Sequence, residues 1–336
     1  MITSTRRFGI EIEFAAPSQE ALVKLQRTLN IVHDGSLRPL QHAGEYVSEP
    51  LQGRAGDETI RNVCEMLKKA GAMATDPKTS IHVHLDGKKG EGNLRTGRTA
   101  CASVPAHTQV AISNKLKKEL KTADILHIVN RNAHRVQNHP NWYTNEFDGV
   151  IFYSLAILKA KPRVNYTYYW LEKPDRFTWL RNMFFFYTKF SDVMEAIVSD
   201  SRKFGNMYCI PLGKSYDLDV IAKTTNVEEL SSVWYKNRPP RGQYDDSRYH
   251  NVNLDCYWYK HGTVEIRSHG GTLDPNKILL WTALHQKIAD KLEDLPFEDL
   301  YDLGNSPQDF VNFIEEPMLQ DYVKRLLGFY SGIKIK

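Results

Sequence analysis

Residues 8–14 read Phe-Gly-Ile-Glu-Ile-Glu-Phe, and this stretch decides the fold that the sequence predicts. Successive side chains of a β-strand point to opposite faces, so residues i and i+2 share a face. Glu11 and Glu13 therefore point one way, and the isoleucines beside them point the other way. The stretch predicts a strand that packs on a core with one face and presents paired carboxylates on the other.

Two further segments repeat this pattern. His82 and His84 share one face of the strand expected for Ser-Ile-His-Val-His-Leu. Glu265 and Arg267 share one face of the strand expected for Gly-Thr-Val-Glu-Ile-Arg. If the three strands belong to one sheet, its polar face carries carboxylates, imidazoles and a guanidinium. That is the composition of a metal and phosphate site.

Each pair taken alone also has a simpler interpretation. Glu11 and Glu13 fit a solvated strand face, the two histidines fit a half-exposed strand, and Glu265 fits an ion pair with Arg267. However, two carboxylates this close usually share a cation or a proton. The three pairs together favour a metal site, and a carboxylate-rich ligand set favours Mg²⁺ or Mn²⁺ over Zn²⁺.

The composition is that of a globular protein with a packed core. The chain has 336 residues, is 41% hydrophobic and 25% charged, and has a net charge of +4, too small to indicate nucleic-acid binding. Its four cysteines form no Cys-x-x-Cys pair, so we expect reduced thiols in a cytoplasmic protein. The polar first seven residues predict no signal peptide, and no apolar run approaches the ~18 residues of a membrane span.

Local patterns predict the remaining elements and one domain. Neither a GxxxxGK[ST] loop nor a GxGxxG loop occurs, so phosphates must be held by other means. Residues 86–109 predict a long loop. We expect a mostly helical insertion at about 110–200 and a helical tail at about 291–336. We expect helices at residues 18–30, 57–70, 110–134, 147–160, 175–199 and 274–290. Ser18 is the expected N-cap of the first of these helices, and Asp274 that of the last. Extended segments are expected at residues 45–50, 164–170 and 249–255, and a hairpin at 256–259 with 263–267.

The order of the motifs resembles the amidoligase family, relatives of glutamate–cysteine ligase and glutamine synthetase. The segments that carry the resemblance are Gly-Ile-Glu-Ile-Glu-Phe, Asp-Gly-Ser-Leu, Gly-Glu-Tyr-Val-Ser-Glu-Pro-Leu, Ile-His-Val-His, Arg-Tyr-His-Asn-Val-Asn-Leu and Gly-Thr-Val-Glu-Ile-Arg-Ser-His-Gly-Gly-Thr-Leu-Asp. They cover roughly residues 6–86 and 202–290. The resemblance implies an α+β fold with helices on its outer face. Its twisted, mostly antiparallel sheet forms a funnel-like active site.

The resemblance also implies an activity and its cofactors. The enzyme would be an ADP-forming ligase that uses ATP and Mg²⁺ or Mn²⁺ on the concave face of the sheet. ATP would phosphorylate a carboxylate, and an amine would attack the acyl phosphate to give an amide or isopeptide bond. The substrates would be a small-molecule or peptide carboxylate and an amine, and a modified nucleobase is one conceivable acceptor. No membrane partner is implied.

Roles for single residues follow from the resemblance, matched position by position. The metal ligands would be Glu11, Glu13, Glu45, His82 and Glu265, and Glu49 is a further candidate beside Glu45 whose role the sequence leaves open. The catalytic residues would be Arg267, which stabilises the transferring phosphoryl group, Glu265, and Asp34 near the amine. His84, Arg202, Arg248 and Arg267 would contact the phosphates of the nucleotide or the carboxylate of the substrate. The basic side chain of Lys277 is a further candidate for these contacts.

Two other functions are compatible with the same residues. The first is a metal-dependent phosphoester hydrolase that uses the carboxylates and histidines without ATP. The second is a non-catalytic binding or assembly protein that keeps only the sheet. A requirement for ATP would distinguish the ligase from the hydrolase, and metal-linked nucleotide binding would distinguish it from the binding protein.

Overall fold

The computed structural model describes residues 4–37, 40–75, 77–87, 94–97, 142–147, 150–155, 168–172, 176–203, 205–241, 245–259 and 262–335. The chain divides into two compact units. The main unit comprises Met1–Lys89 and Arg176–Lys336, and the inserted unit comprises Gly90–Asp175. The main unit combines an antiparallel sheet with helices, so the predicted α+β class is confirmed. The single domain stays a prediction.

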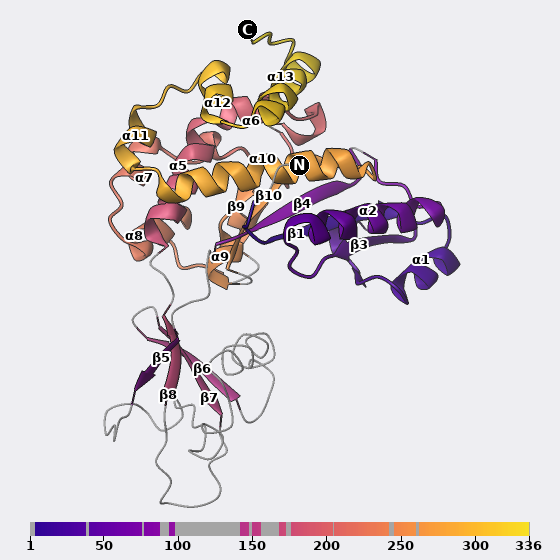
Figure 1. Cartoon of the computed structure of the whole chain (residues 1–336), viewed down its shortest axis with the longest axis horizontal. Helices are drawn as coiled ribbons and strands as arrows, with labels where there is room; N and C mark the ends of the chain where they lie inside the picture. The colour runs from indigo at the N-terminus through magenta and orange to yellow at the C-terminus, as the bar shows by residue number, and fades with distance from the viewer. Residues whose placement is uncertain are drawn as a thin grey trace, which may run out of the picture. The chain divides into compact units, whose positions relative to one another are not determined.

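A six-stranded antiparallel sheet organises the main unit (Figure 1). Its order is β2-β3-β1-β4-β10-β9. The strands are β1 Phe8–Ala15, β2 Ile31–Val32, β3 Ala43–Val47, β4 Ser80–Asp86, β9 Val252–Asn253 and β10 Thr263–Gly270. The three strands expected from the polar pairs, β1, β4 and β10, are therefore neighbours, with β4 between the other two.

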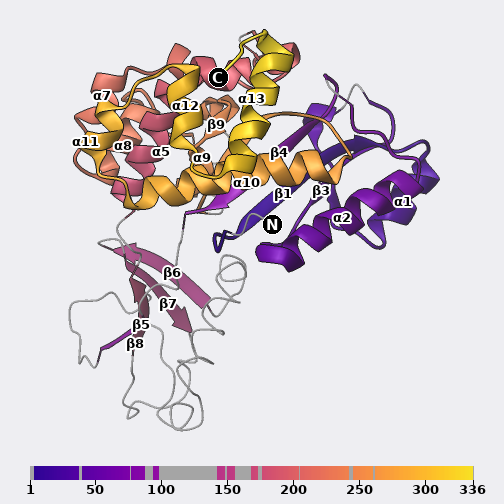
Figure 2. The same cartoon turned by 45° about the horizontal axis from the view of Figure 1, so that its top comes forward.

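The apolar face of this sheet is buried against helices. Ile12, Val83 and Ile266, which alternate with the polar pairs, have no exposed surface. Complete burial of such a side chain stabilises the fold by about 2 kcal/mol. Helix α10 (Pro275–Asp294) packs on β4 and on α2 (Gly53–Lys69), and both views show α10 running across the sheet (Figure 2). The polar pairs therefore occupy the face that points away from these helices.

Helices α6 (Ser191–Ala196), α7 (Leu218–Ala222), α8 (Val227–Trp234) and α11 (Phe297–Asp302) gather with α10 around the aromatic helix α5 (Phe177–Lys189), whereas α1 (Gln19–Gln26) lies beside α2 (Figures 1 and 2). Phe184, Phe185 and Phe186 are buried there and form part of the core. The remaining helices are α9 Asp255–Tyr259, α12 Pro307–Phe313 and α13 Pro317–Ser331. Short 3-10 helices occupy Gly35–Leu37, Asp200–Arg202, Leu212–Lys214 and Asp246–Tyr249. No helix in the described part of the chain is both long and apolar enough to cross a membrane.

A buried arginine connects the start of β1 to α10. The Arg6 side chain has no exposed surface, its Nε lies 2.9 Å from Asp290 Oδ1, and its Nη2 donates to the carboxylate of Glu293. Its Nη1 donates to the carbonyl oxygen of Asp86 at 2.5 Å, and its guanidinium lies 5.1 Å from the centre of the Trp179 ring. A fully buried guanidinium requires such complete pairing, since its desolvation is costly.

Local signals predicted several helix ends correctly. Ser18 Oγ accepts a hydrogen bond from the amide of Ala21 at 3.1 Å, and Asp274 Oδ1 accepts one from the amide of Asn276 at 2.9 Å. Helices α5 and α6 fill the predicted segment 175–199, and α11 to α13 form the predicted helical tail. Helix α2 begins at Gly53, before the predicted start at residue 57.

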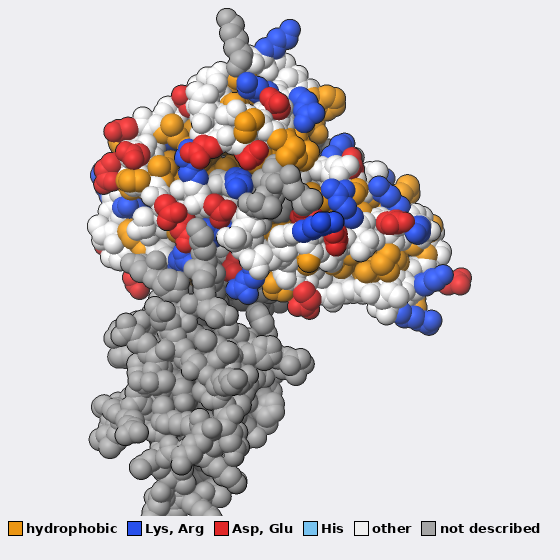
Figure 3. All heavy atoms as spheres, in the orientation of Figure 1, with side chains coloured by type: hydrophobic (Ala, Val, Ile, Leu, Met, Phe, Trp, Pro, Cys, Tyr) orange, Lys and Arg blue, Asp and Glu red, His pale blue; other side chains and the backbone are white. Residues whose placement is uncertain are grey.

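The predicted hairpin at residues 256–259 is wrong, because this segment is the helix α9. Asn253 Oδ1 accepts a hydrogen bond from the amide of Asp255 at 2.8 Å, which turns the chain out of β9 and starts α9. The three cysteines in the described residues, Cys64, Cys209 and Cys256, are free thiols. Figure 3 shows Lys and Arg mixed with Asp and Glu over the described part of one face, in agreement with the small net charge.

The inserted unit contains a four-stranded antiparallel sheet of order β5-β8-β7-β6. Its strands are β5 Leu94–Gly97, β6 Trp142–Phe147, β7 Val150–Leu155 and β8 Tyr168–Glu172. The helix predicted at 147–160 is wrong over β7, where the run Val-Ile-Phe-Tyr favours a strand through its β-branched and aromatic side chains. The loop predicted at 86–109 contains β5, and the helix predicted at 110–134 lies outside the described residues.

Candidate functional site

The strand register aligns the polar pairs in one row across the sheet. In this register Glu13 lies opposite Glu45, and Glu11 lies opposite His82. On the next strand pairs His84 lies opposite Glu265, and Glu265 lies opposite Asn253. Opposite residues on antiparallel strands share a face, so these side chains converge. The acidic face, as we name it, consists of Glu11, Glu13, Glu45, His82, His84, Glu265 and Arg267.

Three side chains at the centre of the acidic face form a first possible ligand group. His82 Nδ1 lies 3.0 Å from Glu11 Oε2 and 3.3 Å from Glu265 Oε1. One ligand atom from each of these residues lies within 4.8 Å of the other two. Two carboxylates and an imidazole at this separation can bind one divalent cation.

A second possible ligand group adjoins the first and shares His82 with it. Glu13, Glu45 and His82 are all buried, and their ligand atoms also lie within 4.8 Å of one another. The amide of Ser80 donates to Glu13 Oε2 at 2.6 Å, and Ser80 Oγ lies 3.0 Å from His82 Nε2. Ser80, the first residue of β4, thus fixes the positions of Glu13 and His82.

Glu265 is the most heavily contacted carboxylate of the acidic face. Arg267 Nη1 donates to Glu265 Oε1 at 2.6 Å, and Asn253 Nδ2 donates to Glu265 Oε2 at 2.7 Å. The thiol of Cys256 lies 3.4 Å from the same Oε2 atom. His84, which lies opposite Glu265 in the register, is held by Thr263, whose Oγ1 lies 3.0 Å from His84 Nδ1. These contacts fix the orientation of the carboxylate before any ligand binds.

In the second group, burial and neighbouring carboxylates oppose the ionisation of Glu45. Burial raises the pKa of Glu45 to about 9, and the nearby charges of Glu11, Asp34, Glu13 and Glu265 add to this effect. Glu45 is therefore protonated at neutral pH in the protein alone. A divalent cation would replace that proton, which is how buried carboxylate clusters usually become ionised.

In the first group, cationic neighbours outweigh burial. Burial opposes ionisation of Glu11, but His84 and His82 hold the pKa of Glu11 well below its ordinary value. Burial likewise opposes ionisation of Glu265, but Arg267 and then the two histidines lower the pKa of Glu265. In turn, Glu265 and Glu11 raise the pKa of Arg267 against the effect of burial. The two groups therefore differ in charge although they adjoin.

The structure places the other predicted site residues in three different surroundings. Asp34, in the turn that follows β2, contributes its charge to the environment of Glu45. Arg202 is buried, and its guanidinium donates to the carbonyl oxygen of Thr79, next to the serine that holds Glu13. Arg248 donates from Nη2 to the hydroxyl of Tyr249 at 2.6 Å.

Lys277 and Glu49 lie away from the ligand groups. Lys277 is in the first turn of α10 and lines a pocket that includes no residue of the acidic face. Glu49, whose role the sequence left open, is exposed and follows the end of β3. Tyr46 lies on the core side of the sheet, where burial raises its pKa and the charge of Glu49 raises it further.

Sequence reasoning missed the residues that support the ligands. Asn253, Cys256 and Ser80 contact Glu265 or Glu13 but were not proposed as site residues. A signal for Asn253 was present, because Asn251-Val252-Asn253 repeats the alternation of polar and apolar residues seen in the three pairs. No comparable signal existed for Ser80, since its contact with Glu13 uses the backbone amide.

The donor set fits hard divalent cations. It consists of four carboxylates and the one imidazole of His82, which both groups share, without any cysteine ligand, and oxygen-rich sites of this kind favour Mg²⁺ or Mn²⁺. A cation there would carry open positions, because each group offers only three protein atoms. Phosphate oxygens or water would fill them.

A comparison with protein-family models identifies one family. The model described as "putative amidoligase enzyme" matches residues 40–134 and 172–289, which is more than half of the chain. The match includes Glu45, His82, Glu265 and Arg267, whereas β1 with Glu11 and Glu13 precedes it. A search of curated proteins finds no match.

Proposed function

Because the chain belongs to the putative amidoligase enzyme family, which marks it as a ligase-type enzyme, we propose that it is an ATP- and Mg²⁺-dependent carboxylate–amine ligase. The observation that carries this proposal is the pair of adjoining ligand groups on the acidic face, with Arg267 bound to Glu265 beside them. In our proposal the sheet takes the funnel-like form that the sequence resemblance implies.

We assign one ligand group to each of two cations. Glu11, His82 and Glu265 would hold one ion, and Glu13 with Glu45 would hold the other. His82 belongs to both groups but lies 3.0 Å and 3.3 Å from the carboxylates of the first, so we assign it there. When bound, the cations would neutralise the phosphate oxygens of ATP and orient the terminal phosphate.

The proposed reaction has two balanced steps. A carboxylate oxygen of the first substrate attacks the γ-phosphorus of ATP, the bond between the γ-phosphorus and the bridging oxygen breaks, and ADP leaves. The amine nitrogen of the second substrate then attacks the acyl carbon of the acyl phosphate. The bond from that carbon to the phosphate oxygen breaks, inorganic phosphate leaves, and the nitrogen loses one proton.

The side chains of this protein would act mainly through charge and position. Glu265 and Glu11 keep the Arg267 guanidinium ionised against the effect of burial by raising its pKa, and its Nε has no hydrogen-bond partner among the described residues. Such a guanidinium can stabilise the charge that develops on the transferring phosphoryl group. Asp34 would accept the proton of the amine, because its charge acts on Glu45 of the second group.

Hydroxylamine trapping tests the proposed reaction without knowledge of the amine. The protein is incubated with ATP, Mg²⁺, hydroxylamine and pools of carboxylates, including amino acids and peptides. We expect ADP and a hydroxamate in equal amounts, with no product when Mg²⁺ is omitted. Glu49→Gln, which changes an exposed carboxylate outside both groups, should keep this activity. Cleavage of a phosphodiester without any nucleotide would instead show the hydrolase.

A further inference from the structure

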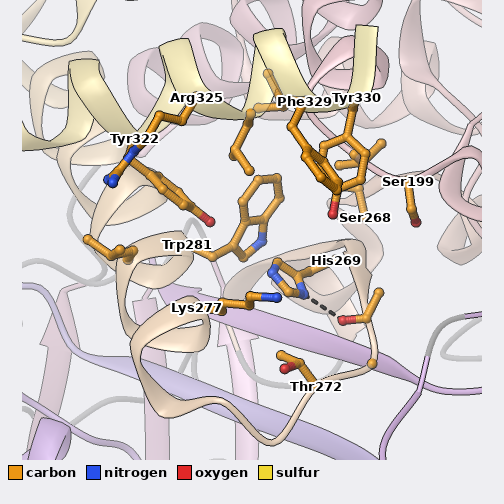
Figure 4. A pocket seen from close by; sticks show the side chains of 16 residues that line it. Ser199, Ser268, His269, Thr272, Lys277, Trp281, Tyr322, Arg325, Phe329 and Tyr330 are labelled. Atoms are coloured by element: carbon orange, nitrogen blue, oxygen red, sulfur yellow. Dashed lines mark hydrogen bonds between the residues drawn. The ribbon is translucent and has the colours of Figure 1, made fainter.

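A pocket of about 560 Å³ lies on the helical side of the main unit, apart from the acidic face. Its walls are the end of β10, the connection to α10, the first turns of α10, the residues after α6, and α13. Figure 4 shows Tyr322 and Tyr330 of α13 on one side, facing Trp281 and His269 on the other. This volume suits a ligand of metabolite size.

A β-bulge in β10 separates the pocket from the acidic face. Ile266 pairs with Val83, but the next pair is His269 with Ile81, so β10 carries one extra residue here. Ile81 is on the buried apolar face, and its partner His269 therefore points to the helices and not to the side of Arg267. The ring centre of His269 lies 5.3 Å from that of Trp281. One strand thus serves two separate sites.

The pocket is cationic. Its sixteen lining residues, all in the described part of the chain, include Lys277 and Arg325 but neither Asp nor Glu. Figure 4 shows the amino group of Lys277 pointing toward His269. Two cations without a neighbouring carboxylate in the lining favour an anionic ligand.

Two buried polar groups at the pocket lack partners. Trp281 Nε1 and Ser268 Oγ belong to residues that are each 1% exposed, and neither atom has a hydrogen-bond partner among the described residues. Buried donors are nearly always satisfied in folded proteins, so an acceptor is missing here. A carboxylate or phosphate oxygen would supply it.

The remaining walls are aromatic and apolar. Trp281, Tyr322 and Tyr330 line the pocket, and Phe329, which is 79% exposed, lies at its margin. Flat side chains on two sides suit a flat ligand, because aromatic faces stack or meet edge to face.

We propose that this pocket is a second ligand site that binds a small organic anion with an aromatic body. The aromatic body would lie between α13 and Trp281, and the anionic group would contact Lys277, Arg325 and the indole N–H. The proposal does not depend on the activity of the acidic face, since the two sites share no residue.

Calorimetry with ligands of one body and different charge tests the proposal. The probes are 2-naphthoate and 2-naphthyl phosphate as anions, naphthalene-2-methanol as the neutral analogue and naphthalene-2-methylamine as the cation. We expect at least one anion to bind about tenfold more tightly than the neutral analogue and more tightly still than the cation. The ratio between the two anions identifies the carboxylate or the phosphate as the preferred group.

Matched variants locate the binding. Arg325→Gln changes an exposed side chain and should weaken anion binding about tenfold, and Trp281→Phe should weaken it about fivefold by removing the indole N–H. Lys324→Gln, next to Arg325 on α13 but outside the lining, is the control and should bind as wild type does. Binding of a non-hydrolysable ATP analogue should be the same in Arg325→Gln and wild type.

Three results would overturn the proposal. The first is binding of the neutral or cationic analogue as tight as that of the anions, because the pocket would then be merely apolar. The second is equal weakening by Lys324→Gln and Arg325→Gln. The third is the absence of binding by every probe at millimolar concentration, which would leave water as the partner of Trp281 and Ser268.

Discussion

Replacing Glu265 with Gln removes one negative charge from the centre of the acidic face and keeps the shape of the side chain. Glu265 is buried, and its two oxygens accept from Arg267 and Asn253 at 2.6 Å and 2.7 Å. The amide oxygen of Gln can still accept from one of these donors, but its amino group cannot replace the second acceptor. We therefore expect Glu265→Gln to fold, with lower stability and one ligand group impaired.

The size of the stability loss follows from the pKa of Glu265. Its ordinary value of 4.5 is lowered to about 2 in the folded protein, which corresponds to about 3 kcal/mol at neutral pH. This contribution is present above pH 4.5 and is lost as the pH falls toward 2. Since Gln keeps part of the hydrogen bonding, we expect a loss of about 2–3 kcal/mol in the free energy of unfolding.

Two measurements on the same samples check this prediction. Urea unfolding at neutral pH reports the stability, and electron paramagnetic resonance with Mn²⁺ reports the number of bound cations. We expect two Mn²⁺ ions per chain in wild type, and in Glu265→Gln at least tenfold weaker binding of one of them. Glu49→Gln should retain both ions. Two ions bound to Glu265→Gln with wild-type affinity would refute the assignment of Glu265 as a ligand.

Other parts of the structure give three further predictions. Arg6→Met should lower the free energy of unfolding by about 1–3 kcal/mol, because the half-buried carboxylates of Asp290 and Glu293 each lose a charged donor, while Ser4 still contacts Asp290 and Arg176 still pairs with Glu293. An unchanged stability in urea would contradict the pairing of this buried guanidinium. Gly271→Ala would place a Cβ atom 1.9 Å from Thr79 Oγ1, so we expect a loss of about 1–3 kcal/mol and weaker Mn²⁺ binding. Gly328→Ala, within α13 and without a clash, should instead raise the free energy of unfolding by about 0.5–1 kcal/mol and leave Mn²⁺ binding unchanged. Burial, and then the charge of a neighbouring histidine, lowers the pKa of His285 to about 3. The free energy of unfolding should therefore fall by about 2 kcal/mol as the pH is lowered from 7 to 5, because the unfolded chain binds a proton that the folded protein does not. His285→Gln should abolish this pH dependence, and an unchanged pH dependence would show that another group titrates.

The strands that carry the acidic face could be predicted because their signal is local. Alternation of Glu11 and Glu13 with isoleucines has a period of two, which only a strand places on two faces. The same reasoning held for His82 and Glu265 on β4 and β10. That the three strands are neighbours was a hypothesis from the residues, and the family resemblance made it specific. The cation and nucleotide roles of these residues stay predictions.

The rest of the arrangement depends on contacts that no local pattern contains. Helix α9 begins at a hydrogen bond from Asn253, although its aromatic residues resemble a strand. The bulge in β10 reverses the direction of His269, and a regular strand would have placed it beside Arg267. The pocket also needs α13, which is remote in sequence from β10. The sequence therefore predicted Lys277 as a phosphate ligand and did not predict its place in this pocket.

Calorimetric binding of a non-hydrolysable ATP analogue, with and without Mg²⁺, tests the central claim most directly, because it needs no knowledge of the substrates. It compares wild type, Glu13→Gln and the control Glu49→Gln. We predict saturable binding that requires Mg²⁺ in wild type and in the control, and at least tenfold weaker binding in Glu13→Gln. Binding of the analogue without Mg²⁺, or unchanged binding in Glu13→Gln, would contradict a nucleotide site built on the cations of the acidic face.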